Sequence, residues 1–243
     1  MTAILHRHLP DDMRITRALP GIRPETGPWL RVDEAYGPQM ARREALLQAQ
    51  ANDVLYLEEA ARPAAQELLA LVLSELPRLG YAVKDDAVWC PDGRQVHVDG
   101  ATPLRTLGRL CQCDFVLMEK RHAQHVLTGA VPCFPASWRL WEKAGRPLTD
   151  IHVPVAEYDR DVARRVQRLF DGIQVGRPLW RFNQLWYQDP ELHQPRSAHE
   201  PRRVGARSDP GPYYRPERQP QSRAVVFAIH TLVLARADVP PLT

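Results

Sequence analysis

The chain has 243 residues, of which 44% are hydrophobic and 25% are charged, and these values suit one large folded domain or one domain with an extension. The formal net charge of +3 argues against a nucleic-acid-binding protein, which usually carries a strong and clustered basic excess. The first residues lack the apolar run of a signal peptide, and no apolar run reaches the roughly 18 residues of a membrane span, so we expect a cytoplasmic chain.

Residues 1–28 are rich in Pro, Gly and Arg, and we predict an extended N-terminal arm with little structure of its own. A helical part follows over about residues 29–80. Residues 36–50 repeat apolar side chains at helical spacing, which predicts one helix. Residues 62–80 hold the clearest helix of the chain, with a proline in the first turn and a Pro and Gly at the end.

The next part of the chain favours β-structure. Residues 87–100 predict two short strands about a Pro-Asp-Gly turn. A longer hairpin follows, with strands over about residues 111–119 and 125–134. Ser137 then suits the N-cap of a short helix that a Gly-Arg-Pro break ends.

The C-terminal third mixes one helix with strands. Residues 159–173 predict an amphipathic helix, and residues 177–189 and 224–235 predict strands, the second of them a buried β-branched run. Between these strands, residues 193–223 are dense in Pro, Arg, Ser and Gly, and we predict a long loop there. Helices gathered on an antiparallel sheet indicate the α+β class.

The four cysteines are Cys90, Cys111, Cys113 and Cys133, and none forms a Cys-x-x-Cys pair. Without a second pair at suitable spacing, a zinc or iron–sulfur site is not favoured. We expect reduced, half-buried thiols.

His152 is the first candidate for a functional residue. The break before it and the Val-Pro after it restrict the backbone, because a residue that precedes proline is held extended. A rigid imidazole near Phe134, Trp138 and Trp141 suits an axial ligand of haem iron. The alternative, which this pattern alone favours, is a structural histidine that caps the preceding helix or bonds a backbone carbonyl.

The stretch "CQCDF" is the second candidate. In a strand, Gln112 and Asp114 point to one face, whereas Cys111, Cys113 and Phe115 point to the other. An acid beside an apolar pocket can pair with a cationic amine or relay protons, so Asp114 and Gln112 are candidate catalytic residues. The alternative is a carboxylate on the solvent side of an edge strand.

Arginines form the third candidate set, because guanidinium groups bind carboxylates such as haem propionates in a bidentate manner. The residues concerned are Arg146, Arg181, Arg215 and Arg218. Arg181 stands in an otherwise apolar strand, which gives it more interest than a surface arginine. The remaining histidines that we considered are interpreted as structural: His97, His122, His125, His193, His199 and His230.

Several motifs, in this order along the chain, resemble the haem-binding alpha subunit of the haem-dependent oxidative N-demethylase family. They are "WLRVDEAYGPQMARREALL", "ELLALVLSELP", "DFVLMEK", "FPASWRLWEKAGRPLTDIHVPV", "RPLWRFN" and "RPERQ". The resemblance covers about residues 29–234, and the string that contains His152 is its most specific part.

The resemblance implies that residues 29–243 form a single Per-Arnt-Sim-like (PAS-like) haem-binding domain. It implies haem b as the cofactor, O2 as co-substrate and a small amine that loses a methyl group as formaldehyde. Electrons would come from a separate NADPH-, flavin- and iron–sulfur-containing reductase protein, since this chain has no motif for flavin or NAD(P)H. His152 becomes the expected axial ligand, and Arg181 and Arg218 become the first candidates for the propionates or a substrate carboxylate.

Two positions depart from the pattern of the family. Cys113 stands where the family carries a glutamate before Asp114. After Gln219, a short Pro-Gln-Ser-Arg link replaces the family's Thr-Leu-Arg-Arg-Leu-Pro stretch. A non-catalytic haem sensor or carrier, and a degenerate subunit that binds a partner through the 195–223 segment, therefore stay open beside the monooxygenase, as does the oligomeric state.

Overall fold

The structure, a computed structural model, describes the backbone of residues 3–14, 22–24, 27–151, 160–182, 185–187, 189–197, 200, 207–218 and 224–240. Side chains are described for all of these residues except 12, 160–163, 182, 185 and 207–218.

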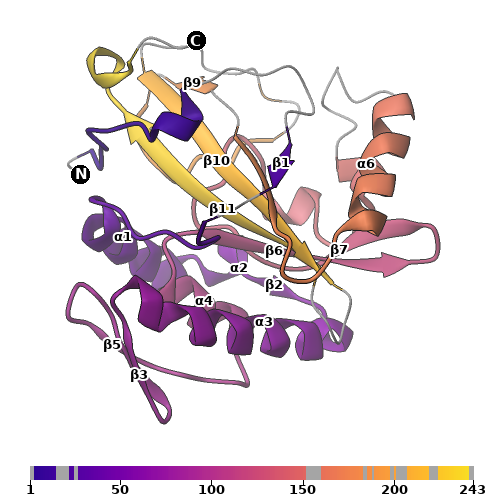
Figure 1. The fold of residues 1–243 in the computed structure, drawn as a ribbon, viewed down its shortest axis with the longest axis horizontal. Coiled ribbons are helices and arrows are strands. Elements are labelled where there is room, and N and C mark those ends of the chain that lie inside the picture. Colours follow the sequence, from indigo (N-terminus) through magenta and orange to yellow (C-terminus); the bar gives the residue numbers. More distant parts are fainter. Residues whose placement is uncertain are drawn as a thin grey trace.

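Within the described residues, one antiparallel sheet forms the centre of the fold (Figure 1). From edge to edge its strands follow the order β1-β8-β10-β11-β6-β7-β2, and β9 pairs with the other end of β10. Its strands are β1 (Arg23–Pro24), β2 (Tyr56–Leu57), β6 (Asp114–Arg121), β7 (Gln124–Val131), β8 (Leu179–Phe182), β9 (Leu185–Tyr187), β10 (Arg207–Arg218) and β11 (Val225–Leu234). A smaller sheet joins β3 (Ala82–Lys84), β4 (Ala87–Trp89) and β5 (Gln95–His97).

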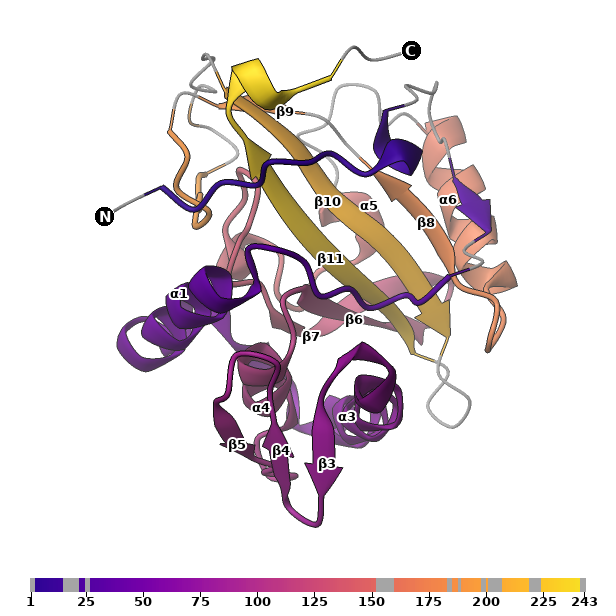
Figure 2. The same ribbon diagram turned by 60° about the vertical axis from the view of Figure 1, so that its left-hand side comes forward.

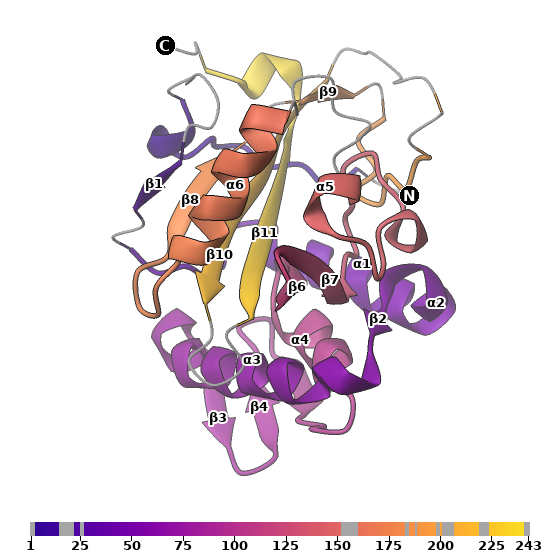
Figure 3. The ribbon, with the colours of Figure 1, turned by 90° about the vertical axis from the view of Figure 1, so that its right-hand side faces the viewer.

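Helices cover both faces of the central sheet, as Figures 1 and 3 show from two sides. One group is α1 (Tyr36–Ala49), α2 (Ala51–Val54), α3 (Arg62–Glu75) and α4 (Pro103–Leu110). The opposite face carries α5 (Leu148–Ile151) and α6 (Arg160–Gly172). Short 3-10 turns connect these elements: η1 (Asp11–Met13), η2 (Glu59–Ala61), η3 (Leu76–Leu79), η4 (Leu140–Glu142) and η5 (Arg236–Asp238).

The side chains of β6 and β11 alternate between two apolar clusters. Phe115 and Val226 pack with the α1, α3 and α4 side chains in one cluster, which we call the helical-face cluster. Val116 and Ile229 pack with α5 and α6 side chains in the other, which we call the α5–α6 cluster. Successive residues of a strand point to opposite faces, so strands covered on both sides are continuously apolar.

The N-terminal part of the chain crosses the sheet twice. Figure 2 shows one segment that contains η1 and a second that leads into α1, both passing over β10 and β11. β6 pairs with β11 only as far as Ile229, so the second half of β11 lies beyond the end of β6. His6 forms a parallel bridge with Leu234 there and extends the sheet.

The observed fold is α+β, as the sequence predicts. The predicted helices at 36–50, 62–80 and 159–173 are confirmed as α1, α3 with η3, and α6. Both predicted hairpins are confirmed, and the strands predicted at 177–189 and 224–235 correspond to β8 with β9 and to β11. The four cysteines are free and fully buried rather than half-buried.

Two predictions of local structure are wrong. Ser137 does not cap a helix: its φ is 64°, and only the three-residue turn η4 follows, after Arg139. The hydroxyl of Ser137 instead contacts the Tyr187 hydroxyl at 2.7 Å. The loop predicted at 193–223 contains β10, which pairs with β11 from Ser208 to Arg218. Tertiary pairing there outweighs the unfavourable strand propensity of Pro and Gly.

Candidate functional site

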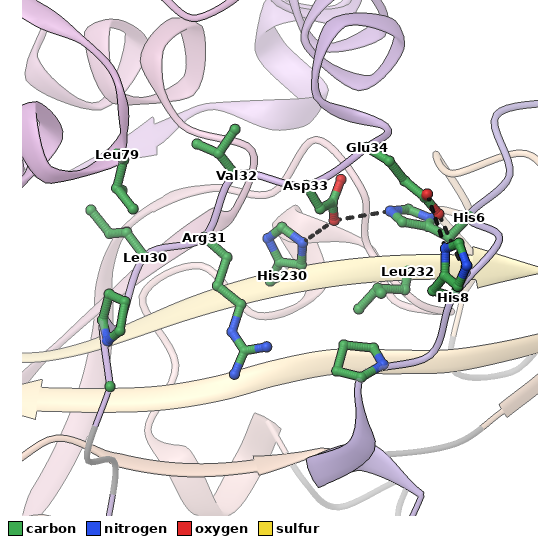
Figure 4. A pocket seen from close by; sticks show the side chains of 13 residues that line it. His6, His8, Leu30, Arg31, Val32, Asp33, Glu34, Leu79, His230 and Leu232 are labelled. Atoms are coloured by element: carbon green, nitrogen blue, oxygen red, sulfur yellow. Dashed lines mark hydrogen bonds and ion pairs between the residues drawn. The ribbon is translucent and has the colours of Figure 1, made fainter.

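A half-open pocket of about 520 Å³ lies over the end of β11, between the two N-terminal segments (Figure 4). Its polar side carries the side chains of His6, His8, Asp33, Glu34 and His230, and its apolar side includes Leu30, Val32, Leu79 and Leu232. Three parts of the chain that are distant in sequence therefore meet here: the N-terminal arm, the segment before α1, and β11.

Asp33 is the centre of the polar side. Its Oδ2 atom accepts hydrogen bonds from His230 Nε2 at 2.7 Å and from His6 Nε2 at 3.0 Å. Its Oδ1 atom accepts from the backbone N–H of Ala35 at 2.9 Å and from the amide of Gln112 at 2.5 Å. Four donors thus occupy this one carboxylate.

The protonation states follow from these contacts. Burial opposes ionisation of Asp33, but hydrogen bonds and charges from His230 and His6 outweigh it and lower the pKa of the carboxyl below its usual range. Burial lowers the pKa of His230, and the neighbouring Asp33 opposes this only in part. His6 accepts the Val233 N–H at Nδ1, so its Nε2 carries the hydrogen that Asp33 receives.

These contacts hold the N-terminal arm in place and leave few polar groups open to a substrate. The lone pairs of Asp33 are occupied by protein donors, and Glu34 accepts from the arm's Arg7 and His8 backbone N–H groups. His6 also donates its backbone N–H to the Val233 carbonyl at 2.7 Å. The polar side of the pocket is therefore a hydrogen-bond network that joins the N-terminal arm, the segment before α1 and β11. We call this network the anchor.

Gln112, predicted as a catalytic residue, belongs to this anchor. Its side chain is buried, and besides donating to Asp33 it accepts the backbone N–H of Asp33 at 3.2 Å. This reciprocal pair joins the start of β6 to the segment before α1. These contacts indicate that Gln112 holds the backbone of the segment before α1 in position.

Asp114, the other predicted catalytic residue, lies deeper in the protein. Its carboxylate contacts Arg43 Nη1 at 2.6 Å and accepts the backbone N–H groups of Cys133 and Phe134 at 2.8 and 2.9 Å. Burial raises the pKa of Asp114, whereas the Arg43 charge and these three donors act against that rise. Because all three partners donate, the geometry suits an ionised carboxylate in a buried ion pair.

Four further predicted residues are described, and they do not come together. Phe134 is buried in the helical-face cluster, beneath the Arg43 guanidinium at 5.3 Å from its ring. Trp138 packs against the α5–α6 cluster. Arg146 is exposed, and Arg181 is half-buried on β8. His152 lies outside the described residues, and for Arg218 only the backbone, at the end of β10, is described.

Sequence reasoning missed Arg43, Asp33 and His6, and it treated His230 as structural. The sequence contained a signal for Arg43 and for His230. Arg43 stands on the apolar face of α1 with Met40 and Leu47, and His230 stands inside a buried β-run. A polar residue at such a position needs a buried partner.

From residue 21 to residue 240, the chain matches the family described as "Haem-dependent oxidative N-demethylase, alpha subunit-like". The chain belongs to this family. The resemblance of the motifs is thereby confirmed, over a slightly longer range than they indicate. A comparison with curated proteins gives no match.

Membership points to an oxidative enzyme subunit whose family is named for its dependence on haem. Within the described stretches, no helix combines the length and the apolar character that a membrane span requires. The described residues also contain no group of three or more His, Cys, Asp or Glu side chains arranged around a metal ion. A haem would need only a single protein ligand for its iron.

The α5–α6 face is more apolar than the pocket at Asp33. Its cluster contains Met118, Ile151 and Phe170 and is made of apolar side chains. Thr128 lies in β7, and its buried hydroxyl has no hydrogen-bond partner within the described part of the chain. A buried hydroxyl normally has a partner, so a bound group or a water could supply one.

Proposed function

We propose that this chain binds haem b on the α5–α6 face of its sheet, with His152 as the axial ligand of the iron. Ile151, the residue before His152, is buried in the α5–α6 cluster, and this observation carries the proposal. The chain is therefore buried among apolar side chains directly before His152 in the sequence. An imidazole that starts from such a wall is suited to an iron at the centre of a flat apolar ring.

The strand arrangement supports a PAS-like fold for the haem domain. Five antiparallel strands follow the order β7-β6-β11-β10-β8, so the first hairpin lies beside the last strand. α5 and α6 belong to the connection between β7 and β8. A cofactor held between that connection and the sheet would contact the α5–α6 cluster.

Of the predicted cofactor contacts, we keep three as part of this proposal. Trp138 packs against the α5–α6 cluster and would contact the macrocycle. Arg181 and Arg218 are our candidates for the propionates or a substrate carboxylate. The position of Phe134 in the helical-face cluster and the exposure of Arg146 do not support contact with a group on the opposite face.

The proposed reaction is an O2-dependent oxidation of a small amine or related nitrogen compound, with loss of a methyl group from nitrogen. Haem supplies the oxygen chemistry when it is bound, and a separate reductase protein supplies the electrons. The contacts of Asp114 and Gln112 favour a positioning role for both residues, since each is bonded to other parts of the protein interior.

Reductant-dependent oxygen consumption tests this function. Haem-loaded protein with a reductase and candidate secondary amines should consume O2 and release formaldehyde in equal amounts. The variant His152→Ala should lose this activity, and the matched control His97→Ala, which changes an exposed histidine of β5, should keep it. Haem-loaded protein that consumes no O2 with any amine would support a haem sensor or carrier instead.

A further inference from the structure

The outer surface of α6 and of the turn that follows it is basic. Residues 160–177 contain five arginines and two aspartates, which gives a formal charge of +3. This equals the formal charge of the whole chain, so the charges of all other residues cancel. Figure 3 shows α6 in front of β8 and β10, with its outer side toward the viewer. The arginines of this stretch whose side chains are described are all exposed, and we call them the α6 arginine surface: Arg164, Arg165, Arg168 and Arg177.

The positions of these arginines along α6 do not favour the helix itself. Arg160, Arg164 and Arg168 stand four residues apart, and like charges at this spacing destabilise a helix. Cations stabilise a helix in its last turn, but the last turn of α6 contains no basic residue. Asp171, which lies near that end, forms an ion pair with Lys120 of β6 at 2.7 Å. A partner outside the helix therefore explains this row of arginines better than helix stability does.

The turn after α6 adds an apolar side chain to the same stretch. Gly176 has a φ of 70°, and the Arg177 N–H donates to the Gln174 carbonyl at 3.2 Å, so the chain reverses here. Val175 lies inside this turn and is 51% exposed, which is unusual for a large aliphatic side chain. Protein interfaces combine apolar contacts with a polar rim and are enriched in arginine. The exposed residues of this stretch have that composition.

The buried side of the same stretch belongs to the α5–α6 cluster. Phe170 and Ile173 are both buried in it. An α-helix with its side chains is about 10–12 Å across. A protein that binds the outer side of α6 would therefore lie about one helix diameter from the face where we propose that haem binds.

We propose that the α6 arginine surface, together with Val175, is the docking site for an electron-donating protein with an acidic surface. The electron-donating role rests on the proposed function, whereas the acidic character of the partner rests on the charges of α6. Guanidinium groups bind carboxylates, and complementary charges raise the rate at which two proteins associate. Electron-transfer complexes are small and short-lived. Four exposed arginines beside one apolar side chain suit such a complex.

Binding in the absence of haem tests the surface. A plant-type [2Fe–2S] ferredoxin, a small acidic electron carrier, is titrated with the full-length apoprotein at about 0.1 M salt, where charges more than about 10 Å apart are screened. The double variant Arg164→Glu with Arg168→Glu should weaken binding roughly tenfold, and the difference should disappear at about 1 M salt. The control Arg78→Glu with Lys84→Glu makes the same change of charge on η3 and β3, at two other exposed residues, and should weaken binding no more than about twofold.

Two results of these titrations would overturn the docking site. One is equal weakening by the α6 variant and by the control, since the effect would then follow from net charge alone. The other is a duplex oligonucleotide that binds as tightly as the ferredoxin and is weakened equally by the α6 variant, because the surface would then attract any polyanion.

Reduction of bound haem tests the role of the partner. Reduced ferredoxin is mixed with ferric, haem-loaded protein under CO, and the absorbance of the ferrous CO complex gives the second-order rate constant. The α6 double variant should lower this constant roughly tenfold at about 0.1 M salt and leave the haem content unchanged. Apoprotein that binds ferredoxin through α6 but takes up no haem would contradict the haem proposal alone. Haem-loaded protein whose reduction does not depend on the α6 charges would contradict the docking proposal alone.

Discussion

A hydrogen bond of 2.7 Å between Asp33 Oδ2 and His230 Nε2 joins residues that are 197 positions apart. Because the same oxygen also accepts from His6, one carboxylate connects the N-terminal arm, the segment before α1 and the last strand. Neither His6 nor His230 is near Asp33 in sequence. We therefore expect the arm to contribute to the stability of the whole domain.

Asp33→Asn tests this connection. The amide would present an N–H group toward donors that now bond a carboxylate, and unmet buried donors cost about 1–3 kcal/mol. The free energy of unfolding in urea should fall by about that amount. The control Asp85→Asn changes an exposed acid in a left-handed turn that asparagine tolerates, and it should have no measurable effect. If both variants were as stable as the parent protein, the hydrogen bonds of Asp33 would not stabilise the domain as we expect.

The pKa of His230 predicts how stability depends on pH. Burial lowers this pKa in the folded protein, so below about pH 6.5 the unfolded chain takes up a proton that the folded protein resists. Stability is therefore fully present above that pH and decreases as the pH falls toward the folded pKa. Asp33, whose pKa is also lowered, acts in the same direction at lower pH. His6, Arg31 and Asp33 are the charged or titratable groups that influence His230.

Urea unfolding at pH 8, 6.5 and 5 checks whether the free energy of unfolding falls on acidification. The parent protein should lose stability between pH 6.5 and pH 5, and His230→Gln should show a smaller loss over the same interval. A parent protein that becomes more stable on acidification to pH 5 would show that the sign is wrong.

The buried pair of Arg43 and Asp114 makes a separate prediction. Arg43→Met leaves the Asp114 carboxylate buried with two backbone donors but no counter-ion, and the expected cost is about 3–5 kcal/mol. The double variant Arg43→Met with Asp114→Asn should recover part of that loss, since it removes the uncompensated charge. Additive losses in this double-mutant cycle would show that the two side chains are not coupled.

Helices and most strands could be predicted from the sequence, because the local pattern of apolar residues indicates them. α1, α3 and α6 repeat apolar residues at helical spacing, and β11 is a continuous apolar run. β10 could not be predicted, since Pro210, Pro212 and Pro216 lack the N–H group that strands use. Its position between β8 and β11 depends on long-range pairing, which no local pattern reports.

The site was less predictable than the fold. "CQCDF" was expected to place Gln112 and Asp114 together at a pocket, but their partners, Asp33 and Arg43, differ and come from earlier parts of the chain. Such partners become visible only when the helices are packed on the sheet. The family motif led to the identification because it is a long ordered string rather than a single residue.

Arg181 provides a test of the proposed propionate contact. Removal of a hydrogen bond to a charged group typically costs about 1.5–3 kcal/mol, so Arg181→Gln should weaken haem binding roughly tenfold or more. Arg177→Gln, which changes an exposed arginine just before β8, serves as the matched control. Haem titration of apoprotein, followed by absorbance, gives both affinities. Identical affinities in the two variants would exclude Arg181 as a propionate partner.

One absorption spectrum tests the central claim most directly. Purified protein reconstituted with haem and freed of excess is measured in the ferric state, then after reduction with dithionite and addition of CO. We predict a stoichiometric Soret band that shifts on reduction and with CO, and that His152→Ala weakens or displaces while His97→Ala leaves it unchanged. A protein that stays colourless after haem supplementation, or a His152→Ala spectrum identical to that of the parent, would contradict the account.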